Sequence, residues 1–193
     1  MRDIDIRCAL REEMARMHNG EPDTLIVEEL GLCQGVARVD LAVVNGTVHG
    51  YEIKSERDTL ARLPSQTGVY NRTLEFVTVV AAKSHTASAR LLIPQWWGIW
   101  EATKRSSKVE LRIVRKARRN PRLDSYAIAQ LLWRSEALQA LSERGLSCGM
   151  LSKSRRQLWE CLASSVTIAE LGSIVREQLK RRGESWRVLV RPS

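Results

Sequence analysis

Residues 37–56 constrain the fold of this chain more than any other stretch. Two runs of apolar residues flank an Asn-Gly dipeptide at positions 45 and 46, which is the strongest short signal of a β-hairpin. Three charged residues interrupt these runs: Asp40 in the first, and Glu52 and Lys54 in the second. Because an unpaired charge in a half-buried sheet is costly, their convergence indicates a functional site.

The turn of this hairpin decides whether its two carboxylates share a face of the sheet. A strict two-residue turn pairs Asp40 with Tyr51 and leaves Glu52 on the opposite face. A three-residue turn or a one-residue bulge brings both carboxylates to one face. If the two carboxylates act together, the sequence therefore predicts such an irregularity, with Gly46 in the left-handed region.

The apolar periodicity around the hairpin predicts an α/β sandwich with a mixed β-sheet. The expected elements are a helix over 2–18, a strand over 24–32, the hairpin, a helix over 58–72 starting at Ser55 or Asp58, a strand over 75–82, a short helix over 88–92, and strands over 96–101 and 108–114.

The pattern changes after Asn120-Pro121, where only helical periodicities follow. They predict helices over 123–141, 153–163 and 168–182. Ser152 and Thr167 are the expected N-caps, and Gly183 is the expected stop of the last helix. We therefore divide the chain into a core over 1–118 and a small helical subdomain over 119–193.

The charge balance indicates a polyanionic partner. The formal net charge is +9 and the pI is near 9.9, and nucleic acid is the commonest partner of such proteins. A solvated basic face is the alternative interpretation, and a phosphate-binding face would bind without sequence preference and with strong salt dependence. The densest basic stretch contains Lys104, Arg105, Lys108, Arg112, Arg115, Lys116, Arg118, Arg119 and Arg122.

Cysteine, histidine and hydropathy patterns favour a cytoplasmic protein. The four cysteines and three histidines are scattered, so neither a zinc site nor a disulfide framework is indicated. No apolar run approaches the roughly 20 residues that cross a bilayer, and the N-terminus does not resemble a signal peptide. We expect no membrane partner. Trp96, Trp97 and Trp100 are expected to pack in the core rather than to stack on bases.

The charged residues of the hairpin suit metal chemistry on phosphate. Asp40 and Glu52 provide the oxygen ligands that Mg²⁺ prefers. A bound metal acidifies a water molecule and stabilises charge on a phosphate, and Lys54 would orient that water or stabilise the transition state. A structural ion pair between Asp40 and Lys54 is the alternative interpretation.

Asp40 followed by Glu52-Ile53-Lys54 resembles the Asp…(Asp/Glu)-x-Lys signature of the PD-(D/E)XK nuclease superfamily, although Val39 stands where Pro is usual. Gln66 and Tyr70 resemble the Gln-x-x-x-Tyr element of the RecB-like branch. The resemblance covers residues 1–118 and implies a restriction-endonuclease-like sheet flanked by helices. It also implies a nuclease that depends on Mg²⁺, with Mn²⁺ as the substitute ion, and hydrolyses DNA.

The resemblance also implies roles for neighbouring residues. The carbonyl of Ile53 would be a third metal ligand, and Gln66 and Tyr70 would position the lysine or the substrate. Arg38 is a candidate phosphate contact, with a solvated arginine as the alternative. Members of the superfamily usually add an acidic residue from the first helix or strand. The candidates are Glu13, Glu28 and Glu29, of which we favour Glu29.

Three hypotheses follow from the sequence. The first is a metal-dependent nuclease, the second a nucleic-acid-binding protein of the same fold without turnover, and the third a regulatory or structural interaction protein. The sequence does not distinguish DNA from RNA, single from double strands, or exonuclease from endonuclease activity. It also leaves the oligomeric state open, a homodimer included.

Overall fold

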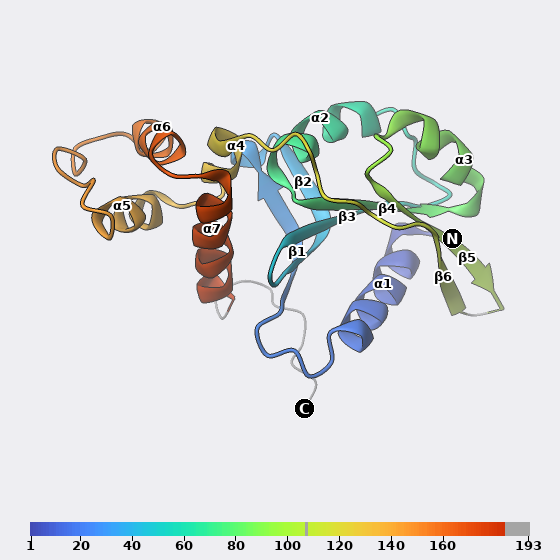
Figure 1. Ribbon diagram of the computed structural model, residues 1–193. Helices are drawn as coiled ribbons and strands as arrows, with labels where there is room; N and C mark the ends of the chain where they lie inside the picture. The colour runs from blue at the N-terminus through green and yellow to red at the C-terminus, as the bar shows by residue number, and fades with distance from the viewer. Residues whose placement is uncertain (107, 184–193) are drawn as a thin grey trace.

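A six-stranded mixed β-sheet with helices on both faces organises the computed structural model, which describes residues 1–106 and 108–183 (Figure 1). The strands follow in space the order that they have in the sequence. They are β1 (Leu25–Leu32), β2 (Ala37–Val44), β3 (Val48–Lys54), β4 (Phe76–Ala82), β5 (Gly98–Arg105) and β6 (Lys108–Arg115). The helices are α1 (Asp3–Met17), α2 (Leu63–Thr73), α3 (Lys83–Leu92), α4 (Ser125–Ala129), α5 (Arg134–Ser142), α6 (Arg155–Ser165) and α7 (Ile168–Arg182), and a 3₁₀ turn, η1 (Cys33–Gly35), links β1 to β2.

The directions of the strands follow from their connections. β1, β2 and β3 are joined by short turns and pair antiparallel, as do β5 and β6. β3, β4 and β5 are parallel, and α2 and α3 form the two crossovers that parallel pairing requires. β4 lies inside the sheet, and six of its seven residues are buried. The mixed α/β architecture predicted from the sequence is therefore confirmed.

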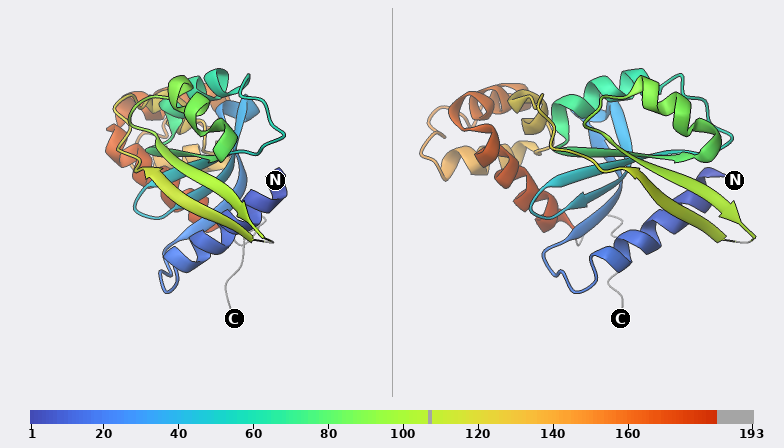
Figure 2. Two further views of the ribbon diagram at one scale, coloured as in Figure 1. Left: turned by 90° about the vertical axis from the view of Figure 1, so that its right-hand side faces the viewer. Right: turned by 45° about the vertical axis from the view of Figure 1, so that its right-hand side comes forward.

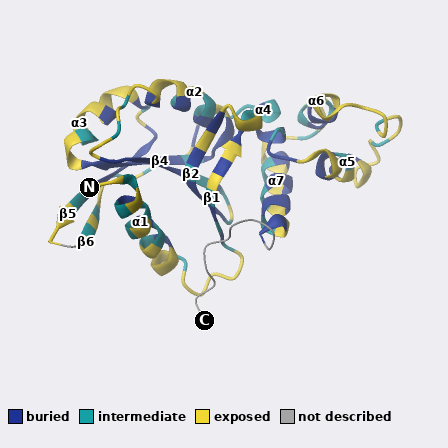
Figure 3. Cartoon of the chain, turned by 180° about the vertical axis from the view of Figure 1, so that it is seen from behind, coloured by how far each residue is buried: buried dark blue, intermediate teal, exposed yellow. Residues whose placement is uncertain are grey.

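The two faces of the sheet carry separate apolar clusters. α1 covers one face, where Ile6 and Leu10 pack with Leu41 and Tyr51. α2 and α3 lie on the opposite face (Figures 1 and 2). The larger cluster occupies that face, and Figure 3 shows the buried strands between half-exposed helices. Because each helix is buried along only one side, its outer side is free to carry charge.

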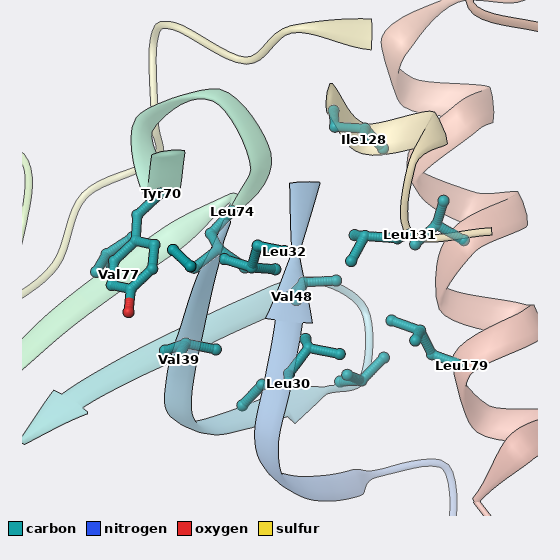
Figure 4. Close-up of a cluster of buried hydrophobic side chains, with 14 of the residues drawn as sticks. Leu30, Leu32, Val39, Val48, Tyr70, Leu74, Val77, Ile128, Leu131 and Leu179 are labelled. Carbon is teal, nitrogen blue, oxygen red and sulfur yellow. The ribbon is translucent and has the colours of Figure 1, made fainter. Parts of the chain in front are cut away.

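The helices after β6 share the larger apolar cluster. Leu131 and Leu179 point toward Leu30 and Leu32 of β1 and Val48 of β3 (Figure 4). Thr167 caps α7 by accepting the N–H of Glu170, as predicted. α7 ends at Arg182 with Gly183 as its C-cap, also as predicted. α6 begins after Ser154, whose hydroxyl accepts the N–H of Gln157, so the predicted cap at Ser152 is wrong.

The helix predicted over 123–141 is divided into α4 and α5. Asp124 accepts the N–H of Ala127 and caps α4, which ends at Ala129. A second N-terminus forms at Trp133, whose N–H donates to the Glu136 carboxylate at 2.7 Å. Each capping interaction satisfies backbone N–H groups at the start of a helix. The chain can therefore begin a second helix at low cost, which explains the break between α4 and α5.

Three other elements, and the conformation of Gly46, differ from the prediction. α2 begins at Leu63 because the Asp58 carboxylate accepts the backbone N–H and the hydroxyl of Ser55, which forms a tight turn there. α3 begins at Lys83, directly after β4, rather than at 88. β5 begins at Gly98 rather than 96 and runs on to Arg105. Gly46 does not have a positive φ. No helix within residues 1–106 and 108–183 is long and apolar enough to cross a membrane.

Candidate functional site

The β2–β3 turn has the irregularity that the sequence predicts. Val44 pairs with Val48 and Leu41 with Tyr51, so three residues, 45–47, form the turn. The N–H of Asn45 donates to the carbonyl of Thr47 at 3.0 Å, and its side chain accepts the N–H of Thr47 at 3.2 Å. These bonds close the three-residue turn without a left-handed glycine. If this register is continued by one residue, Asp40 of β2 lies opposite Glu52 of β3.

Glu52 lies at the centre of a buried polar cluster between β3 and α2, which we call the Glu52 cluster. It comprises Glu52, Lys54, Gln66 and Tyr70, each no more than 8% exposed. Oε1 of Glu52 accepts from Lys54 Nζ at 2.7 Å and from Gln66 Nε2 at 2.6 Å. Oε2 accepts from the Tyr70 hydroxyl at 2.6 Å, and Gln66 Oε1 accepts from Lys54 at 3.0 Å. The structure thus brings together four of the residues singled out in the sequence.

Local structure explains why these four side chains meet. Glu52 and Lys54 alternate with Ile53 along β3, so they point to one face, which α2 covers. Gln66 and Tyr70 are four residues apart on α2 and therefore share its buried side. Burial and the Glu52 carboxylate both raise the pKa of Tyr70, so its hydroxyl stays protonated and donates to Glu52.

Asp40 has partners from the other side of the sheet. Its Oδ1 accepts from Arg7 Nη2 at 2.9 Å, and its Oδ2 accepts the N–H of Ile53 at 2.7 Å. Arg7 also donates to the Asp40 carbonyl at 3.0 Å. Burial and the nearby Glu52 charge raise the pKa of Asp40 to about 7, against the lowering effect of the Ile53 N–H and Arg7. Asp40 is thus held by α1, whereas Glu52 is held by α2.

A local irregularity in β1 and β2 accounts for this separation. Val27 and Leu30 both belong to the larger cluster although they are three residues apart, and so do Val39 and Ala42. Strict alternation would place the members of each pair on opposite faces. Both strands therefore change face between these residues, at Glu29 and Asp40. Glu29 has a φ of 57°, a left-handed conformation that is costly for a residue with a side chain.

Two arginines hold Glu29 in this conformation. Arg7 Nη1 lies 3.1 Å from its Oε1, and Arg38 Nε lies 2.6 Å from its Oε2. Arg7 also contacts Asp3 at 3.1 Å, so a single guanidinium joins three carboxylates. We call Asp3, Arg7, Glu29, Arg38 and Asp40 the Arg7 cluster. Arg7 was not among the predicted site residues. Its place next to Ile6 on the buried side of the first helix, together with three acidic residues in the following strands, was a usable signal.

The other acidic candidates are paired elsewhere. Glu28 lies 3.4 Å from Arg11, and Glu13 contacts Arg16 on the exposed side of α1 at 2.6 Å. Arg38 is two-thirds exposed and contacts Glu29, while its carbonyl lies 2.9 Å from the Tyr70 hydroxyl.

The donor set does not suit the Mg²⁺ ion expected from the sequence. Each carboxylate oxygen of Glu52 and Asp40 already accepts a hydrogen bond, and the two carboxylates are held from opposite sides of the sheet. No group of three or more acidic, histidine or cysteine residues within 1–106 and 108–183 has a geometry that could hold a metal ion. We therefore derive no step through a metal, and Mg²⁺ or Mn²⁺ binding stays a prediction from the sequence alone.

A second concentration of charge lies in the sequence between β3 and α4. Residues 59–123 contain thirteen lysines and arginines against three acidic residues, a net charge of +10, whereas the rest of the chain has a net charge of −1. α2 and α3 contain no acidic residue. The whole positive excess of the protein is therefore confined to these 65 residues.

Comparison with known proteins identifies a different family from the one that the motif resembles. The sequence profile described as Bacteriophage P4 protein cII matches residues 1–192. The curated Protein cII of Enterobacteria phage P4 is 28% identical over 182 residues, which are 94% of this chain and 68% of that protein. No solved structure matches.

Assignment to the PD-(D/E)XK superfamily was therefore wrong, and so was the nuclease activity inferred from it. A profile match along nearly the whole chain outweighs a few residues, because Asp…Glu-x-Lys triplets arise by chance in charged sequences.

Proposed function

We propose, from the premise that this chain belongs to the bacteriophage P4 protein cII family, that it is a regulatory protein that binds DNA and hydrolyses no phosphodiester bond. The observation that carries the proposal is the confinement of all excess positive charge to residues 59–123. A surface with this charge attracts phosphate groups and gains affinity when they release their counterions.

Unpaired cations support a binding role for this surface. Among the residues that the structure describes, six basic side chains around α2, α3 and the segment after β6 have no hydrogen-bond or ion-pair partner. They are Arg62, Lys83, Arg90, Lys116, Arg118 and Arg122. Cations that stabilise a fold are usually paired, and an unpaired set is available to a ligand.

The Glu52 cluster supports the absence of hydrolysis. A general base or a metal ligand needs a lone pair directed toward the substrate. Here all donors of the cluster converge on the Glu52 carboxylate, and Tyr70 and Gln66 cover it from α2. We propose that the cluster attaches α2 to β3 and so fixes the basic surface above it.

We also propose that the sheet has a restriction-endonuclease-like shape that serves as a scaffold for binding. The order of α1, three antiparallel strands, a crossover helix and a parallel strand supports this description. It is a proposal about shape alone, since fold and chemistry are separable.

Fluorescence anisotropy with a labelled DNA duplex of about three helical turns tests the proposed function. With EDTA present, we expect the protein to bind the duplex. The logarithm of the binding constant should fall linearly as the logarithm of the salt concentration rises. The same duplex, incubated with the protein and Mg²⁺, should stay intact on a denaturing gel. Absence of salt-dependent binding to any nucleic acid would refute DNA binding, and Mg²⁺-dependent cleavage would refute the non-enzymatic assignment.

A further inference from the structure

Three arginines from separate segments gather at the end of β6. Arg115, the last residue of β6, donates from Nε to the carbonyl of Trp97 at 2.7 Å and from Nη2 to the carbonyl of Pro94 at 3.0 Å. Arg118 follows three residues later, and its N–H donates to the carbonyl of Trp96 at 2.7 Å. Arg90 comes from the last turn of α3. We call Arg90, Arg115 and Arg118 the arginine cluster.

The arginine cluster has no acidic counter-charge of its own. Burial lowers the pKa of Arg115, and the positive charges of Arg90 and Arg118 lower it further. No acidic residue occurs between Phe76 and Trp100, nor between Leu111 and Leu123. Neither Arg90 nor Arg118 has a side-chain partner within the described part of the chain. Repulsion between these like charges is unfavourable in the free protein, so a bound anion would relieve it.

Backbone contacts fix the position of Arg115 within this cluster. Arg115 is fixed by two carbonyls of the segment 94–97, and that segment is fixed in turn by the N–H of Arg118. The ring of Trp97 is fully buried and stacks on Tyr70 with centroids 5.8 Å apart. The arginine cluster is thereby connected through Trp97 to the Glu52 cluster.

The aromatic residues bear on the kind of nucleic acid that fits. Proteins that bind single strands present exposed aromatic rings on which the unpaired bases stack. Over residues 1–106 and 108–183, Trp133 is the only aromatic side chain that is highly exposed, and the guanidinium of Arg182 lies 4.2 Å from the centre of its ring. Trp96, Trp97 and Trp100, which lie nearest the arginine cluster in the sequence, are each at most 9% exposed. The basic surface therefore offers charge without stacking platforms.

We propose that the arginine cluster binds the phosphate backbone of double-stranded DNA, and that this protein binds duplexes rather than single strands. The inference rests on the proposed function and specifies its ligand and contact residues. A duplex keeps its bases stacked inside and presents two rows of phosphates, which is the surface that arginines without aromatic neighbours recognise.

Salt titration of binding by a double variant tests the site. In Arg90→Gln/Arg118→Gln, both substituted side chains lack a described partner, so the fold should be retained. Arg115 is left in place because its loss would leave two carbonyls without a donor. The matched control is Arg16→Gln/Arg181→Gln, which removes the same charge from arginines that pair with Glu13 and Glu177 elsewhere.

We expect the slope of log affinity against log salt to fall by about one per arginine in the cluster variant, with a loss of about tenfold in affinity per arginine at 50 mM salt. The control should keep the wild-type slope. If the wild type binds DNA and both variants show equal slopes, the arginine cluster is not the site, although the proposed function stands. If the wild type binds no nucleic acid, the proposed function itself fails.

Competition with unlabelled nucleic acids tests the choice of duplex DNA. Duplex DNA should compete more strongly than a single strand of the same length and sequence. Equal or stronger competition by the single strand would overturn the preference for duplexes. Stronger competition by duplex RNA would overturn the choice of DNA.

Discussion

The arginines on the two sides of the sheet have different surroundings. On the α1 side, Arg7 and Arg11 each contact at least one carboxylate. On the α3 side, Arg90 and Arg118 have another arginine, Arg115, as their charged neighbour. Net charge alone does not separate these groups, because every one of these side chains carries a single positive charge. Pairing does separate them, and it predicts that the first group supports the fold and the second supports binding.

The largest effect is expected in the interior, where every charge is paired. In Glu52→Gln, the ammonium of Lys54 stays buried without its carboxylate. We expect the free energy of unfolding to fall by about 3–5 kcal/mol, the usual result of removing one partner of a buried pair. Urea denaturation measures it. Glu52→Gln/Lys54→Met removes both charges and should recover part of the loss. A single variant as stable as wild type would mean that the Glu52 cluster does not hold α2 to β3.

The pH dependence of the free energy of unfolding is the next effect in size. Two groups on the α1 side, His49 and Asp40, change it in opposite directions. Burial lowers the pKa of His49 from 6.5 to about 3, so its contribution to stability is lost as the pH falls below 6.5. The pKa of Asp40 rises from 3.8 to about 7, so its contribution is present at low pH and is lost as the pH rises toward 7. Between pH 3.8 and 6.5 the two slopes have opposite signs.

Single substitutions separate these slopes. In Asp40→Asn, stability should fall by about 1.4 kcal/mol for each pH unit from 6.5 down to 4, because the opposing group is gone. In His49→Gln, it should rise over the same interval. Urea midpoints at five pH values measure both. Slopes of the same sign in the two variants would contradict the assignment of opposite shifts.

A smaller loss is expected when the α1-side arginine network is opened. Arg7→Met removes the guanidinium that Asp3, Glu29 and Asp40 share. We expect a loss of about 2 kcal/mol, typical of hydrogen bonds to charged groups, because Asp40 keeps the Ile53 N–H and can take up a proton. Thermal unfolding at constant pH measures it. Arg16→Met, on the exposed side of the same helix, is the matched control and should melt with the wild type. Weaker DNA binding by folded Arg7→Met would break the division between the two sides.

Features that depend on residues close together in the sequence were predicted more reliably than features that depend on distant residues. The three-residue turn of the β2–β3 hairpin was one of two predicted irregularities, because two carboxylates that act together restrict the register. The division of residues 123–141 was missed, because Asp124 and Glu136 fit the surface of one helix as well as the caps of two. The change of face at Glu29 was missed because it depends on Arg7, which is distant in the sequence. The nuclease assignment was wrong because residue identity at a motif does not show whether its carboxylates are already paired.

The smallest expected effect completes the comparison of the two sides. Because Arg90 and Arg118 have no described partner, their replacement by Gln should change the free energy of unfolding by no more than about 0.5 kcal/mol. Relief of repulsion around Arg115 favours a slight gain rather than a loss. Urea denaturation in low salt gives the best resolution, since screening removes the effect in high salt. A loss as large as that of Arg7→Met would show that these arginines support the fold after all. A neutral or slightly stabilising result, with weaker DNA binding, would show that they are retained for a ligand.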